Sequence, residues 1–187
     1  MPVVEIHLLE VYTGDDKARL GSAMTDAVRS VLPAGSDAIT VMIHELPQAD
    51  YFRGGIQRDG APALPDPVQI VRDYLAAMEA RELERAQTLL GAGFTLTFPG
   101  AAPMRTLKEL IDWSAPRYRF VRKTYETFDT SQGGTAAVVH CHGTLNGEWP
   151  DGTAFAGIRF IDRFEIAGGK ITRQDVWNDI AEVKAGS

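Results

Sequence analysis

The chain has 187 residues, a net charge of -6, 44% hydrophobic residues and 24% charged residues, which is the composition of an ordinary globular protein. The acidic balance without a basic run argues against nucleic acid as a partner, and no apolar run approaches the roughly 18 residues that cross a membrane. We expect no signal peptide. Cys141 is the single cysteine, so we expect no internal disulfide and a cytoplasmic location.

Residues 2–10 predict an apolar strand that begins at a proline, with Val4, Ile6 and Leu8 on one face. A methionine before a small residue is normally trimmed, which would leave Pro2 at the N-terminus with a secondary amine. An α-amino group has an ordinary pKa of about 7.7–8, which burial or a cationic neighbour lowers. A neutral amine can serve as a general base without a cofactor. The alternative is that Pro2 only ends a disordered tail.

A helix and a second strand follow this first strand. Thr13-Gly14-Asp15-Asp16 predicts a helix start with a hydroxyl cap, and residues 33–35 end the helix. Residues 38–46 are rich in β-branched side chains and predict a strand, so the crossover implies a parallel pair. Such a unit of about sixty residues buries too little surface to be stable alone, and we expect a homo-oligomer, either a dimer or a hexamer. The predicted apolar stripe of the helix is Leu20, Met24, Ala27, Val28 and Val31.

These elements resemble the 4-oxalocrotonate tautomerase family over roughly the first third of the chain. The similarity is carried by residues 2–10, by the helix, and by Val41-Met42-Ile43-His44-Glu45 with Gly54-Gly55. It implies β-α-β subunits that assemble into dimers and trimers of dimers. It also implies keto-enol tautomerisation of 2-oxo acids without a cofactor, with Pro2 as the catalytic base.

Three further positions correspond to the substrate-binding residues of that family, and a fourth residue, Arg53, lies near them in the sequence. Tyr12 and Thr40 stand where its members commonly place arginines, and the aromatic wall falls at Tyr51. An arginine binds a carboxylate through two parallel hydrogen bonds and a hydroxyl does not, so the pattern disfavours a dicarboxylate substrate. Arg53 lies just before the glycine pair. It is either a partial replacement for the missing positive charge or a solvated hairpin charge.

Residues 57–66 predict a linker between a domain of residues 1–56 and a second domain of residues 67–187. Gly60 and Pro62 belong to a run of glycine and proline that breaks any periodic pattern. The prolines favour a partly extended chain in this linker.

The second domain predicts one long helix and then a curved antiparallel sheet, which is an α+β arrangement. Residues 67–90 are broadly periodic and read as a single helix that ends at Gly91 and Gly93. The other predicted elements are a strand at 94–98, a helix at 106–113 capped by Thr106, and strands at 117–128, 135–148, 153–166 and 171–179.

This order resembles the SnoaL-like branch of the NTF2-like superfamily across residues 66–182. The similarity is carried by Val71-Arg72-Asp73-Tyr74-Leu75, by residues 94–100, and by Gly169-Lys170-Ile171 before Val176-Trp177-Asn178-Asp179. It implies a cone-shaped α+β barrel with a pocket between helix and sheet. The superfamily includes cyclases, isomerases, epoxide hydrolases and non-catalytic binding modules, so the fold does not determine a chemistry.

Asp162 is the candidate catalytic residue of the second domain. Desolvation on an apolar strand face raises a carboxyl pKa, which suits a base or a neutral donor. The alternative is a structural ion pair with Arg122 or another arginine. The apolar residues predicted on the same face are Ala156, Ile158, Phe160, Phe164 and Ile166.

Tyr74 stands where ketosteroid isomerases carry a helix tyrosine that donates to the substrate oxyanion. The carboxylate that those isomerases use as base corresponds to Phe98 or Pro99 here, so their mechanism does not transfer intact. The His-x-His at residues 140–142 lacks an evident third ligand, and we expect no metal site. The other residues predicted to line the pocket are Trp113, His140 and Trp177.

Three functions remain open for this chain. The first is a cofactor-independent isomerase or tautomerase in which Pro2 acts on an enolisable, 2-oxo acid-like compound, while the second domain supplies another small-molecule pocket. The second is a SnoaL-like cyclase or isomerase acting through Asp162. The third is a small-molecule binding module whose proline site has lapsed. The retained Pro2 favours the first, and Tyr12 and Thr40 in place of arginines favour the other two.

Overall fold

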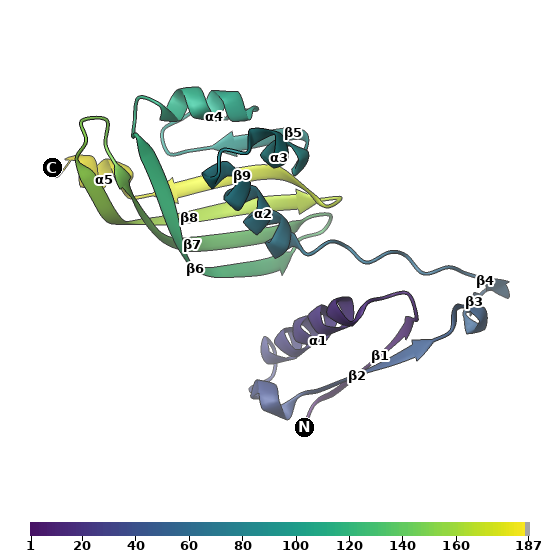
Figure 1. Cartoon of the computed structure of the whole chain (residues 1–187). Coiled ribbons are helices and arrows are strands. Elements are labelled where there is room, and N and C mark those ends of the chain that lie inside the picture. Colours follow the sequence, from purple (N-terminus) through teal and green to yellow (C-terminus); the bar gives the residue numbers. More distant parts are fainter. Residues whose placement is uncertain (186–187) are drawn as a thin grey trace. The chain divides into compact units, whose positions relative to one another are not determined.

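The computed structural model describes residues 1–185, and the chain forms two compact units that divide between Ala63 and Leu64 (Figure 1). We call them the N-terminal unit and the C-terminal unit. Each has its own sheet, and the mixture of helices and strands confirms the α+β fold class. No helix within residues 1–185 combines the length and apolarity needed to cross a bilayer.

The N-terminal unit contains the predicted strand-helix-strand crossover. β1 (Val3–Leu9) and β2 (Thr40–Leu46) pair in parallel, and α1 (Gly14–Arg29) connects them. β2 begins two residues later than predicted because Ser36–Ala38 forms a 3-10 turn. A second 3-10 turn, Gln48–Asp50, precedes a short hairpin of β3 (Phe52–Arg53) and β4 (Ile56–Gln57).

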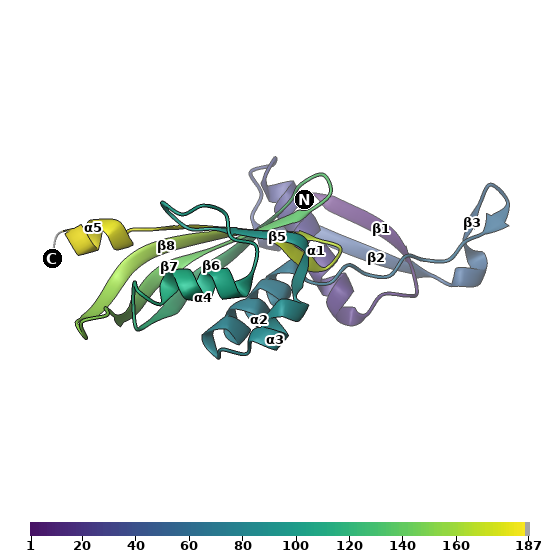
Figure 2. The same ribbon diagram turned by 90° about the horizontal axis from the view of Figure 1, so that it is seen from above.

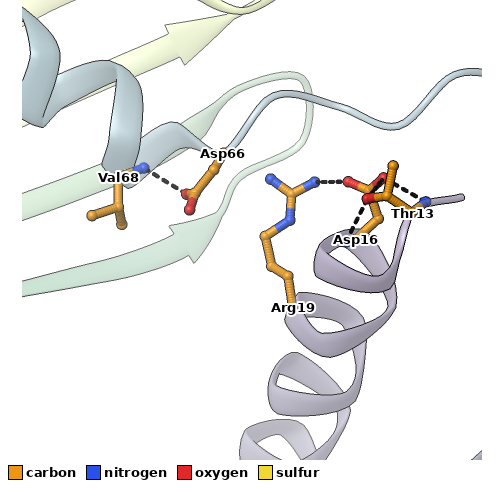
Figure 3. Close-up of polar contacts among 5 residues, drawn as sticks. All are labelled: Thr13, Asp16, Arg19, Asp66 and Val68. Carbon is orange, nitrogen blue, oxygen red and sulfur yellow. Dashed lines mark hydrogen bonds and ion pairs between the residues drawn. The ribbon is translucent and has the colours of Figure 1, made fainter.

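The start of α1 has the hydroxyl cap expected from the sequence, and the structure shows it as part of a capping box (Figure 3). The Thr13 hydroxyl accepts a hydrogen bond from the Asp16 backbone N–H at 3.2 Å, and the Asp16 carboxylate accepts one from the Thr13 N–H at 3.1 Å. These two bonds satisfy N–H groups that have no partner within the helix. The helix start therefore follows from local sequence alone.

The N-terminal unit has little buried core of its own. Leu9 is its one buried side chain, and Leu20, Met24 and Val28 of the helix stripe are only half-buried. The predicted stripe was too wide, because Ala27 and Val31 are exposed and Val31 lies beyond the end of the helix. The second face of this small sheet is exposed at Val3, Glu5 and His7.

The C-terminal unit is a five-stranded sheet in the order β5-β9-β8-β7-β6, with α2, α3 and α4 on one side of its curve (Figure 2). β5 runs parallel to β9, so the prediction of a wholly antiparallel sheet was wrong at that edge. The elements are α2 (Pro67–Glu79), α3 (Leu83–Thr88), β5 (Leu90–Thr97), α4 (Leu107–Ser114), β6 (Phe120–Gln132), β7 (Ala137–Glu148), β8 (Ala154–Ala167), β9 (Lys170–Asn178) and α5 (Ile180–Ala185).

The single helix predicted over residues 67–90 is wrong, because the helix breaks after Glu79. Arg81 adopts a left-handed backbone conformation with φ of 59°, and the chain then resumes as α3. Gly91 and Gly93 lie within β5 and do not end a helix. The predicted start is correct: the Asp66 carboxylate caps α2 by accepting from the Val68 N–H at 2.9 Å (Figure 3).

The core of the C-terminal unit lies between the inner face of α2 and alternate residues of the sheet. On β8, Ile158 through Ile166 alternate between buried and exposed as predicted. Ala156 is exposed, contrary to the prediction, and Phe155 is buried in its place. The cause is a register shift at this end of β8, where Gly157 has φ of 74°.

Candidate active sites

Pro2 lies at the start of β1, next to the start of β2. The Pro2 carbonyl accepts a hydrogen bond from the Thr40 N–H at 3.1 Å, and Val3 is the register partner of Thr40. Both Pro2 and Thr40 are half-buried. This pairing holds the residue that would carry the terminal amine at a defined edge of the sheet.

The other predicted binding residues of the N-terminal unit lie at the opposite end of the strands. Tyr12 follows the last residue of β1, and Tyr51 and Arg53 follow the last residue of β2. The Arg53 guanidinium donates to the Tyr51 hydroxyl at 2.9 Å. Seven residues of strand span about 23 Å, so Pro2 and these three side chains do not meet within one chain.

The open face of the N-terminal sheet is partly apolar. Val3 is 53% exposed, Met42 37% and Leu46 36%. Between them the rings of His7 and His44 stack with centroids 4.9 Å apart. An exposed apolar patch rimmed by polar side chains is typical of an interaction surface.

Asp162 forms the centre of a polar cluster inside the C-terminal unit. Its side chain is fully buried, and its Oδ2 forms an ion pair with the Lys123 ammonium and accepts from the Gln174 amide at 3.3 Å. Its Oδ1 has no hydrogen-bond partner among the described residues. The predicted arginine partner was wrong, since Lys123 takes that role and Arg122 is exposed on the other face of β6.

Burial and the Asp162 charge act on three neighbouring acids. Burial, with a smaller contribution from the Asp162 charge, raises the pKa of Tyr74, whose hydroxyl also lacks a partner among residues 1–185. Burial and the Asp162 charge raise the pKa of Cys141 to about 12. Burial, followed by the charges of Cys141 and Asp162, raises the pKa of Tyr125. All three therefore remain protonated near neutral pH, which leaves Cys141 inert as a nucleophile.

Lys123 is the functional candidate that the sequence analysis missed. On β6 the half-buried Val121, Lys123 and Tyr125 alternate with exposed residues, so Lys123 points inward. Its side chain is 21% exposed, and its nitrogen lies 4.5 Å from the Phe160 ring centroid. The sequence did hold a signal for it. Lys123 occupies an inward position of one alternating strand, and Asp162 occupies an inward position of another strand of the same sheet.

The remaining predicted pocket residues are dispersed. Trp113 on α4 stacks at 4.7 Å on Phe98 and lines a surface hollow of about 570 Å³. His140 and Trp177 lie on the outer face of the sheet, away from Asp162, and Trp177 borders a second hollow of about 340 Å³. Tyr74 is thus the one predicted binding residue that joins Asp162. Within residues 1–185, no three His, Cys, Asp or Glu side chains are grouped as metal ligands would be.

Comparisons of the N-terminal unit with known proteins point to one family. A family model described as a tautomerase enzyme matches residues 2–57. A probable tautomerase of Listeria monocytogenes is 38% identical over 58 residues, which cover 31% of this chain and 95% of the relative. This finding bears out the resemblance drawn from residues 2–10 and from the strand at 41–45.

Comparisons of the C-terminal unit point to a second family. A model described as a SnoaL-like domain matches residues 71–174. An NTF2-like protein of Burkholderia thailandensis matches with a TM-score of 0.54 at 18% identity, over 65% of this chain and 97% of that one. A structure of TerC co-crystallised with polyporic acid matches with a TM-score of 0.53 at 16% identity, over 63% and 95%. At these identities the likeness shows the fold.

Proposed function

Because the chain belongs to the tautomerase family through residues 2–57 and to the SnoaL-like domain family through residues 71–174, we propose that it is a cofactor-independent tautomerase. In this proposal Pro2 is the general base on an enolisable, 2-oxo acid-like compound. The C-terminal unit supplies a second small-molecule pocket. Isomerase or cyclase chemistry is the general activity that both families support.

The observation that carries the proposal is the position of Pro2. Its carbonyl is bonded to the Thr40 N–H, so the nitrogen projects from a paired strand and not from a loose tail. Removal of Met1 frees a secondary amine at that place. Such an amine can take a proton from the carbon next to the substrate carbonyl and deliver it to the oxygen of the resulting enolate.

The complete site requires a second copy of the chain. Tyr12, Tyr51 and Arg53 lie about 23 Å along the strands from Pro2, so in an oligomer the strand ends of one subunit would face Pro2 of its neighbour. The exposed apolar side chains of the open sheet face, with Leu9 as the one buried residue of this unit, support such an assembly. We propose a homo-oligomer, a dimer at least. Light scattering that shows a stable 20.4 kDa monomer at micromolar concentration would contradict it.

The substrate carries fewer negative charges than a dicarboxylate. Tyr12 and Thr40 offer hydroxyls, and Arg53 is the cation available at that end of the unit, with its guanidinium oriented by the Tyr51 hydroxyl. One guanidinium is matched to one carboxylate. A 2-oxo acid with a single carboxylate fits this arrangement.

The proposal is tested on the trimmed protein with phenylenolpyruvate. Pro2→Ala keeps a primary amine but alters its basicity and position, and we expect activity to fall by one to two orders of magnitude, about the scale of a positioned base. A protein that retains Met1 should be inactive, because its Pro2 nitrogen is an amide. Asp162→Asn is the matched control and should change this activity little. If the trimmed wild type is inactive on every 2-oxo acid enol tested, the result would favour a binding module in which Pro2 does not act as a base.

A second candidate function is favoured by the buried carboxylate. Asp162 has one oxygen occupied by Lys123 and Gln174 and one without a partner among residues 1–185. A SnoaL-like cyclase or isomerase acting through Asp162 is therefore the alternative. Loss of activity in Asp162→Asn with Pro2→Ala unaffected would move the chemistry to the C-terminal unit.

A further inference from the structure

The polar cluster around Asp162 has an asymmetry that a purely structural ion pair does not need. Asp162 Oδ2 receives both the Lys123 ammonium and the Gln174 amide, whereas Oδ1 is buried without a partner among residues 1–185. The Tyr74 hydroxyl is likewise buried and without a partner there. Buried polar groups are normally paired, and each exception calls for an explanation, such as a catalytic role or a bound water or ion.

Lys123 differs from the other members of the cluster because it reaches solvent. Its side chain is 21% exposed while Asp162 and Tyr74 are at most 1% exposed. Its ammonium also lies over the Phe160 ring, and Tyr125 packs edge-on against the same ring with centroids 5.8 Å apart. A molecule that approaches Asp162 past Lys123 would therefore meet a cation beside an aromatic wall.

We infer that Lys123 is a substrate-binding residue of a second reaction site, where it stabilises the enolate oxygen formed when Asp162 Oδ1 takes a proton from the adjacent carbon. The electrons of the broken C–H bond form a carbon–carbon double bond, and the carbonyl π electrons move to oxygen. The Lys123 ammonium compensates that charge, and Asp162 returns the proton to carbon. The substrate class is a small enolisable carbonyl compound with an aromatic or apolar body.

This inference deepens the second candidate function and rests on it, and it is independent of Pro2. The protonated state of Tyr74 supports it, because burial and the Asp162 charge raise its pKa and keep the hydroxyl available as a neutral donor. Asp162 compensates the lysine charge when no substrate is bound. Lys123 then balances the substrate charge once Asp162 is protonated, so the site holds no uncompensated charge at either stage.

The test uses 4-nitrophenol as an enolate mimic, because its phenolate and phenol forms absorb at different wavelengths. The full chain is titrated at a pH about one unit below the pKa of the free probe, where the phenol form predominates. We expect the wild type to bind the phenolate and increase its absorption band saturably. Amide resonances of Cys141 and Gln174 should shift in parallel, which locates the probe in the C-terminal unit.

Two variants separate this role from a structural one. Asp162→Asn leaves the ammonium in place, so phenolate binding should be retained or tightened. The double variant Asp162→Asn with Lys123→Met removes both charges without leaving one buried alone, and it should bind phenolate about tenfold more weakly or worse. Lys108→Met is the matched control, since Lys108 pairs with Asp112 on the surface and its side chain is 81% exposed. This control should bind like the wild type.

The outcomes are decisive for the role of Lys123. Equal phenolate binding in the single and double variants would overturn the inference, as would probe shifts confined to residues 3–9 of the N-terminal unit. No turnover is measured, so a failure of the Pro2 chemistry leaves this result unaffected. A positive result here with an inactive Pro2 site would support the C-terminal unit as the place of the chemistry.

Discussion

The two units of this chain differ in how much apolar core each buries within itself. The N-terminal unit buries Leu9 alone, whereas the C-terminal unit encloses a continuous apolar cluster between α2 and its sheet. The second unit also places a carboxylate and a lysine inside that cluster. A self-sufficient core can tolerate such a buried ion pair, while we propose that the unit with the uncovered sheet face is stable only in an oligomer.

The largest expected effect on stability comes from breaking the buried ion pair of Lys123 and Asp162. Lys123→Met leaves the Asp162 carboxylate buried without its cation, and we expect the free energy of unfolding of the C-terminal unit to fall by about 3–5 kcal/mol. Denaturant unfolding followed by tryptophan fluorescence measures this, because Trp113, Trp149 and Trp177 all lie in that unit. Lys108→Met should shift the curve by less than about 1 kcal/mol. Equal effects of the two variants would show that the pair contributes no more than a surface bridge.

Alkaline pH should weaken the C-terminal unit through Cys141. The folded state raises the pKa of this thiol from 9.0 to about 12, so its contribution is fully present below pH 9 and is lost as pH rises toward 12. Above pH 9 the unfolded state releases a proton that the folded state keeps. The slope is about 1.4 kcal/mol per pH unit. Cys141→Ala should flatten the slope between pH 9 and 10 in urea titrations, and an unchanged slope would contradict the assignment.

Dilution should separate the two units. If the N-terminal unit is stable only in an oligomer, mass action lowers its stability by about 1.4 kcal/mol for each tenfold dilution of a dimer. Far-UV circular dichroism should then show a concentration-dependent thermal transition. The tryptophan signal of the C-terminal unit should stay constant over the same range. If the thermal transitions of both units are independent of protein concentration, the two units do not differ in their dependence on a partner subunit.

The smallest expected effects come from the helix caps. Thr13→Ala and Thr106→Ala each remove a capping box, and each should cost about 1 kcal/mol. The tryptophan signal should respond to Thr106→Ala and not to Thr13→Ala. The matched substitutions by serine keep the hydroxyl and should be nearly neutral. A shared response of both units to either variant would indicate that they unfold together.

Side-chain caps made the helix starts predictable from short stretches of sequence. The break after Glu79 was not predictable in the same way. Thr13 and Thr106 were identified as caps because their side chains act on backbone groups three residues away. The break at Arg81 was missed because the apolar periodicity continues across it, and no glycine or proline marks the left-handed residue. Ala156 was misplaced for a related reason, since the bulge near Gly157 shifts the alternation by one residue.

The sequence by itself determined both families, the order of the main strands and helices, and the candidacy of Pro2, Tyr74 and Asp162. These features depend on motifs and on strand or helix period. Only the tertiary structure decided that Lys123 and not an arginine meets Asp162, 39 residues away along the chain. It also separated Tyr12, Tyr51 and Arg53 from Pro2. Periodicity states which face a side chain takes, but the pairing of strands decides which side chains meet across that face.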